Sequence, residues 1–176
     1  SENVWAAHWG VYQAESYFAF DAVVALSVDG STWQEPFLLH QDGTESEHGF
    51  VTLFPQEGSV GAAWLDGRNY IVDGEFLYED HEGNILGTAL HYAKFSPSGE
   101  RLESFELDEI ACDCCLPVVA QSSDGLVLAY RDRSMDERRD IVVRRMSGGN
   151  WQAAVPVGED TAEELVDYLL FVDEAP

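Results

Sequence analysis

Three cysteines and one histidine form the most unusual chemical pattern in this sequence. The three cysteines of the chain, Cys112, Cys114 and Cys115, lie within four residues of one another. Cys112 and Cys114 could chelate one soft metal ion through their thiolates, with His48 as a further ligand, and the ion would be copper(I) or zinc. The thiols could instead form a disulfide, Cys112 with Cys114 or with Cys115, or a cysteine–histidine catalytic pair. The sequence leaves these alternatives open.

A second set of residues places arginine beside aspartate. Asp66 and Arg68 are two residues apart, and Arg131, Asp132 and Arg133 follow one another directly. A guanidinium group binds a carboxylate in bidentate geometry, so the three arginines could anchor an anionic sugar. Asp66 or Asp132 could then act as a general acid. In the alternative interpretation Arg131, Asp132 and Arg133 form structural ion pairs between neighbouring sheets.

Two aromatic residues extend the candidate carbohydrate site. Tyr130 could act as a nucleophile with a nearby glutamate, and Trp9 could stack on a sugar ring. The other tryptophans recur at repeat positions and are interpreted as packing residues.

The composition excludes several classes of partner. Thirty-three acidic residues against nine basic ones give a formal net charge of −24. Such a charge repels nucleic acid and anionic membranes, so neither is an expected partner. No apolar run approaches the roughly 20 residues that cross a bilayer, and 45% hydrophobic residues indicate a globular chain. The acidic composition and the disulfide alternative suit an extracellular or periplasmic protein.

Short apolar segments separated by turn residues predict an all-β chain with about eleven strands. The predicted strands are residues 4–9, 21–27, 33–40, 50–54, 59–65, 85–95, 101–107, 116–120, 126–130, 141–146 and 151–157. Near the end of the chain, a capping box at 161–164 predicts a helix, with a strand at 168–172 as the alternative.

An internal repeat organises these strands. Residues 58–68 align with residues 124–134, and the same offset places His48 on Cys114. The repeated unit is a four-stranded blade of the kind found in β-propellers. Alternate strands return to the same rim of a propeller, so Glu47, His48 and the cysteines are expected on one rim with the arginine–aspartate loops.

The repeat divides a single domain, residues 1–176, into four parts. These are a partial blade (1–44), two blades (45–110 and 111–158) and a C-terminal closing segment (159–176). About three blades are fewer than the four to eight that close a propeller. We therefore expect a second copy or a partner chain to complete the ring, or the chain to be a structural subunit of a larger assembly.

The turn Ser27–Trp33 resembles the Asp-box of bacterial sialidase-like (BNR-repeat) proteins, although it is one residue shorter. Residues 41–54, 63–68, 112–115 and 129–134 are similar to the same group, so the resemblance covers roughly residues 4–158. It implies a β-propeller that binds or hydrolyses a carbohydrate at the rim, and an exo-sialidase-like glycoside hydrolase if the protein is an enzyme. A non-catalytic metal-binding propeller centred on His48 and the cysteines is the alternative.

Overall fold

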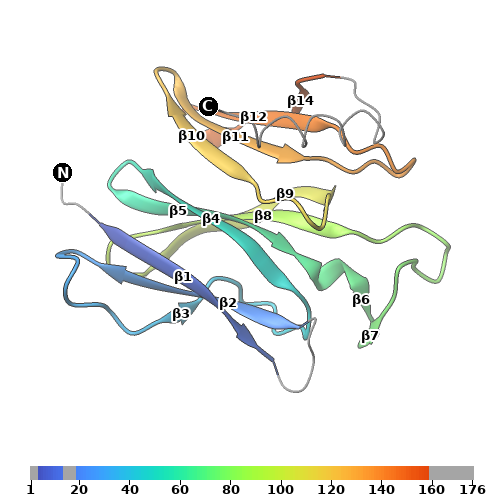
Figure 1. Cartoon of the computed structure of the whole chain (residues 1–176), viewed down its shortest axis with the longest axis horizontal. Coiled ribbons are helices and arrows are strands. Elements are labelled where there is room, and N and C mark those ends of the chain that lie inside the picture. Colours follow the sequence, from blue (N-terminus) through green and yellow to red (C-terminus); the bar gives the residue numbers. More distant parts are fainter. Residues whose placement is uncertain (1–3, 14–18, 159–176) are drawn as a thin grey trace, which may run out of the picture. The chain divides into compact units, whose positions relative to one another are not determined.

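The computed structural model describes residues 4–13 and 19–158, which form antiparallel β-sheets (Figure 1). The predicted all-β class is confirmed, because one 3-10 helix, η1 (Gly67–Tyr70), is the only helix of the described residues. The chain divides into two compact units, Ser1–Pro117 and Val118–Pro176. The helix or strand predicted near residues 161–172, and the closing segment 159–176, lie outside the described residues.

The first unit begins with a three-stranded sheet in the order β1 (Trp5–Tyr12), β2 (Phe20–Ser27), β3 (Phe37–Leu38). The predicted strand at residues 33–40 is observed as only the two residues of β3. In the turn after β2, Asp29 accepts hydrogen bonds from the backbone N–H groups of Ser31 (2.8 Å) and Thr32 (2.7 Å). These bonds, those of Thr32 and Ser31 first, lower the pKa of Asp29 to about 2.

A four-stranded sheet follows, in the order β4 (His48–Gln56), β5 (Ser59–Asp66), β8 (Thr88–Phe95), β9 (Arg101–Ala111). Its two central strands, β5 and β8, are buried along nearly their whole length. A continuous apolar run is typical of a strand that is covered on both faces. The core joins the two sheets through Ala22, Val24, Leu26, Leu39, Val51, Val60, Ala62, Trp64, Ala93 and Phe95.

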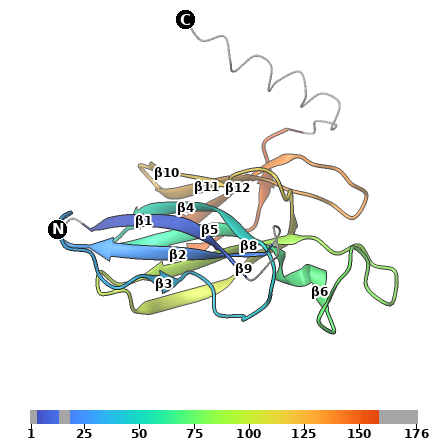
Figure 2. The same ribbon diagram turned by 60° about the horizontal axis from the view of Figure 1, so that its bottom comes forward.

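A small hairpin lies between β5 and β8. It consists of β6 (Ile71–Val72) and β7 (Glu75–Phe76), and it projects beyond the end of the four-stranded sheet (Figure 2). Its two turn residues, Asp73 and Gly74, have φ angles of 53° and 83°. Two successive residues with positive φ define the tight hairpin turn that the pair Asp-Gly favours.

The second unit contains one sheet with β10 (Val118–Ser122), β11 (Gly125–Arg131), β12 (Ile141–Ser147) and β13 (Asn150–Trp151) in sequence order. The short β14 (Val155–Pro156) also pairs with β12. None of the sheets closes on itself within residues 4–13 and 19–158, and the propeller arrangement stays a prediction. No helix in this part of the chain is long and apolar enough to span a membrane.

Candidate functional site

The three cysteines gather their sulfur atoms at the end of β9. Cys112 follows the last residue of that strand and is fully buried, Cys115 is partly buried and Cys114 is exposed. The Cys112 Sγ lies 3.4 Å from the Cys114 Sγ and 3.5 Å from the Cys115 Sγ, and the last two are 3.9 Å apart. All three are free thiols, so the disulfide alternative is not observed. The arrangement offers three soft ligands to one ion.

The surroundings of the Cys114 sulfur change the pKa of its thiol. Burial, followed by hydrogen bonding to Cys112 and by the charges of the two neighbouring cysteines, raises the pKa of the Cys114 thiol to about 12. The Cys114 thiol is therefore protonated at neutral pH unless a cation takes the place of its proton.

His48 has different neighbours from those expected. It is the first residue of β4 and is fully buried, with Nδ1 3.2 Å from the Phe20 carbonyl oxygen. Its Nε2 lies 3.1 Å from Asp42 Oδ2 and 3.7 Å from Asp66 Oδ1. Among the described residues, the potential metal-ligand groups place His48 with Asp42 and Asp66 or with Asp21 and His40, and they place the cysteines with one another. Both nitrogens of His48 thus face acceptor oxygens.

Asp66 and Arg68 bind each other, as their spacing suggests. Arg68 donates from Nε to Asp66 Oδ1 (2.8 Å) and from Nη2 to Asp66 Oδ2 (2.6 Å), and Trp64 Nε1 donates to the same carboxylate (2.9 Å). Asp66 is completely buried. Burial raises the pKa of Asp66, but the hydrogen bond from Arg68 and the nearby positive charges outweigh it, so the pKa lies below its ordinary value. A carboxyl group held ionised in this way suits an ion pair better than a general acid, and its catalytic role stays a prediction.

Two residues of this cluster are missed by the sequence analysis, His40 and Asp42. The His40 ring stacks on the His48 ring with centroids 3.4 Å apart and planes 3° apart. Asp42 accepts from both histidines, at 2.7 Å from His40 Nδ1, and it lies 3.5 Å from Arg68 Nε. Burial raises the pKa of Asp42, but hydrogen bonds from Thr44, His40 and His48 outweigh it and leave the pKa below its ordinary value.

Arg68 occupies the position of a cation in the cluster formed by Asp42, His48 and Asp66. The ligand atoms of Asp42, His48 and Asp66 are close enough together to hold a cation. However, Arg68 Nε already lies 2.8 Å from Asp66 Oδ1 and 3.5 Å from Asp42 Oδ2. Because the guanidinium supplies the positive charge between these carboxylates, the cluster needs no metal ion. The cysteines are the stronger candidate metal centre.

The remaining predicted polar residues lie in the second unit. Tyr130 is 3% exposed, and its hydroxyl accepts a hydrogen bond from Arg144 Nε (3.2 Å). Arg131 donates from Nε to the Arg139 carbonyl oxygen (3.1 Å).

Asp132 and Arg133, which follow β11, also make local contacts. Arg133 forms an ion pair with Glu137, and the backbone N–H of Asp132 donates to the Asp140 carbonyl oxygen (2.8 Å). The Arg133–Glu137 pair is local to the connection between β11 and β12, and both sugar binding and an ion pair between sheets stay predictions for these residues. In the first unit, Trp9 is 41% exposed on β1 opposite Val23, and its stacking on a sugar also stays a prediction.

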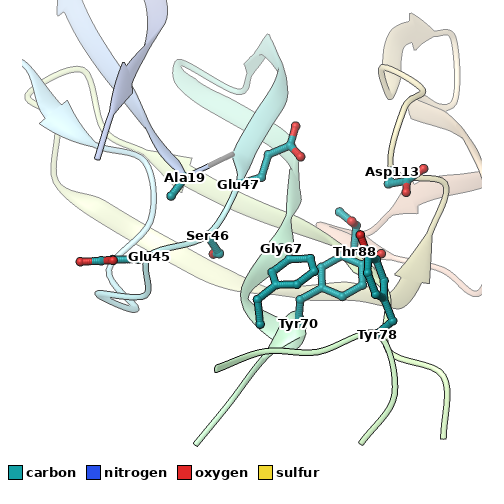
Figure 3. A pocket seen from close by; sticks show the side chains of 10 residues that line it. Ala19, Glu45, Ser46, Glu47, Gly67, Tyr70, Tyr78, Thr88 and Asp113 are labelled. Atoms are coloured by element: carbon teal, nitrogen blue, oxygen red, sulfur yellow. The ribbon is translucent and has the colours of Figure 1, made fainter. Parts of the chain in front are cut away.

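A cavity of about 540 Å³ brings together residues from five segments of the first unit (Figure 3). Its described lining residues are Ala19, Glu45, Ser46, Glu47, Gly67, Tyr70, Phe76, Tyr78, Thr88 and Asp113. Glu47 and Asp113, which are 66 positions apart in the sequence, thus line the same cavity. Gly67 allows the start of η1 to lie close to Glu47. Its N–H donates to the Glu47 carbonyl oxygen at 2.7 Å, and a Cβ at position 67 would meet that oxygen at 3.2 Å. The aromatic residues of the cavity are not predicted from the sequence.

Comparisons of the chain with protein-family models, with curated proteins and with solved structures found no match.

Proposed function

We propose that the protein binds a soft metal ion, zinc or copper(I), through Cys112, Cys114 and Cys115. The supporting observation is the set of sulfur separations, which run from 3.4 to 3.9 Å. Around a tetrahedral ion with metal–sulfur bonds of about 2.3 Å, sulfur atoms lie about 3.8 Å apart. The three thiols are thus already spaced for a shared ion. Thiolates select zinc and copper(I) over harder cations such as magnesium or calcium.

The ligand set follows from the contacts of the neighbouring residues. Both nitrogens of His48 face oxygen atoms of Phe20 and Asp42, so the histidine would have to leave these contacts to ligate the ion. The cysteines alone complete three positions. A zinc ion would take a fourth ligand from outside this set, whereas three thiolates suffice for copper(I).

The test is the metal content of protein purified under reducing conditions and loaded separately with each ion. We expect about one ion per chain after dialysis, because three thiolates act on the same ion. Cys114→Ser should reduce the bound metal to background. His81→Gln, which removes an exposed histidine elsewhere in the unit, should leave the content unchanged.

His48→Gln then separates the two ligand sets. Retention of the metal in a folded His48→Gln protein supports a ligand set of cysteines, and its loss restores His48 as a ligand. A wild-type protein without bound metal, or a Cys114→Ser protein with normal content, would overturn the proposal.

We further propose that the sheets are blades of a sialidase-like propeller. Three observations support this arrangement: the sequential antiparallel order β4-β5-β8-β9, the Asp29-centred turn between β2 and β3, and the start of β5 and β11 at equivalent repeat positions, Ser59 and Gly125. An experimental structure in which the sheets do not radiate from a common axis would contradict it.

A further inference from the structure

The cavity beside the cysteines has walls of two chemical kinds. Tyr70, Phe76 and Tyr78 supply aromatic rings from η1 and the β6–β7 hairpin region, and Glu45, Glu47 and Asp113 supply carboxylates. None of the described residues that line it carries a positive charge. Its volume of about 540 Å³ falls within the range of small-molecule sites.

The aromatic residues form a wall whose outer rings are unusually open to solvent. The ring centroids of Tyr70 and Phe76 are 5.0 Å apart, and those of Phe76 and Tyr78 are 5.2 Å apart. Tyr70 is buried, whereas Phe76 is 52% and Tyr78 is 72% exposed. Exposed aromatic faces of this kind offer apolar contact and attract cations through the ring quadrupole.

The carboxylates give the cavity a negative potential. Figure 3 shows Glu47 and Asp113 on different segments, with the Glu45 and Glu47 carboxylates both directed away from the tyrosine rings. The Glu47 side chain is partly buried and has no hydrogen-bond or ion-pair partner among the described residues. The net charge of −24 adds to the attraction of a positive ligand. A cation is therefore the electrostatic complement of this cavity.

Thr88 provides an independent indication of a ligand. It lines the cavity at the start of β8, is only 5% exposed, and its side chain has no hydrogen-bond partner among the described residues. The Thr88 hydroxyl is not among the fully buried polar atoms that lack a partner, so its oxygen is open to the cavity. A ligand N–H group could donate to it there.

We propose that this cavity binds a small protonated organic amine. The ammonium group lies among the carboxylates, donates to Glu47 or to the Thr88 hydroxyl, and leaves its apolar substituent against Phe76 and Tyr78. This site is separate from the metal proposal, because a protonated amine has no lone pair with which to ligate an ion.

The test compares a charged ligand with a neutral one of nearly the same shape. Isothermal titration calorimetry at pH 7 and low salt would measure 2-phenylethylamine, which is positively charged, against 2-phenylethanol. Glucosamine and N-acetylglucosamine form a second pair that examines sugars. We expect each amine to bind roughly tenfold or more tightly than its neutral counterpart, as one charge-assisted hydrogen bond allows. Equal binding of both members of each pair, or no amine binding at 10 mM, a concentration on the order of the weakest specific affinities, would overturn the proposal.

Three variants locate the binding. Glu47→Gln keeps the shape of the side chain and removes its charge, and it should weaken amine binding about tenfold. Thr88→Val removes only the unpaired hydroxyl, so it should weaken binding without lowering stability. Glu100→Gln removes one charge from an exposed turn away from the cavity and serves as the matched control. Metal content should be unchanged in all three, which separates a failure here from a failure of the metal site. If Glu47→Gln and Glu100→Gln weakened amine binding equally, the amine would be attracted by the overall charge of the protein and not by this cavity, and the proposal would be wrong.

Discussion

Asp42 joins two histidines and an arginine at a single carboxylate. It contacts His40 at 2.7 Å, His48 at 3.1 Å and Arg68 at 3.5 Å. These donors replace the water that the carboxylate loses on folding, so it keeps its charge in a largely buried position. Together with Asp66, the cluster fastens the segment that precedes β4 to the end of β5.

The pH dependence of stability follows from the two depressed carboxyl groups, Asp42 and Asp66. A carboxyl whose pKa is lower in the folded protein contributes stability above its unfolded pKa, about 4, and this stability is lost as the pH falls through the folded value. The free energy of unfolding should therefore decrease from about pH 5 towards pH 2. Urea titrations at several pH values would measure it.

A variant isolates this effect from the general relief of charge repulsion at low pH, which acts in the opposite direction. Asp42→Asn should be less stable at pH 7 and should lose less stability between pH 5 and pH 3 than the wild-type protein. Asp73→Asn, at a side chain that is 86% exposed, should keep the wild-type slope. Parallel curves for Asp42→Asn and the wild type would contradict the assigned role.

Sequence reasoning finds part of this chemistry, for physical reasons. The cysteine sulfurs lie together because the three residues are almost adjacent in the sequence. Asp66 is the N-cap residue of η1, and the Arg68 side chain two residues later turns back to bind its carboxylate. His40 and Asp42 escape notice because tertiary packing places their loop on β4 and β5. The same packing directs His48 to Asp42, a contact that the repeat alignment does not contain.

At the level of elements, each strand predicted within the described residues overlaps an observed strand, because alternation and turn residues are local signals. The β6–β7 hairpin, in contrast, is observed but not predicted. Its signal, Asp73-Gly74 between Ile71-Val72 and Glu75-Phe76, is present in the sequence, but strands of two residues are too short to show alternation. The hairpin carries Phe76 and is flanked by Tyr70 and Tyr78, so the aromatic wall of the cavity is missed together with it.

Gly74→Ala tests whether this hairpin depends on its turn. Gly74 has a φ of +83°, a conformation that costs a residue with a Cβ about 1–2 kcal/mol. The hydrogen bond from the Leu77 N–H to the Tyr70 carbonyl oxygen should therefore open more often, and hydrogen exchange at Leu77 should accelerate about tenfold. Amine binding should weaken as Phe76 shifts.

The control places the same strain in another turn of the same unit. Gly58, between β4 and β5, has a φ of +78° and open space around its Cβ position. Gly58→Ala should leave exchange at Leu77 unchanged. Equal acceleration in both variants would mean that the hairpin opens only with the whole unit.

At the scale of the molecule, charge and architecture oppose each other. In the proposed propeller, the sheets of this chain are blades that form only part of the ring. We therefore expect copies of the chain to associate. A charge of −24 on each chain resists that association through repulsion. Salt shortens the range of this repulsion, from about 10 Å at 0.1 M to about 3 Å at 1 M.

Light scattering coupled to size-exclusion chromatography would therefore show a mass that rises with salt, towards a multiple of the 19.6 kDa chain. The rise should also depend on protein concentration, because association follows mass action. Most electrostatic attractions weaken as salt is added, so a complex that strengthens with salt points to apolar contacts that the acidic surface opposes. A mass of 19.6 kDa at every salt and protein concentration would exclude ring completion by copies of this chain and leave a different partner as the means of closing the ring.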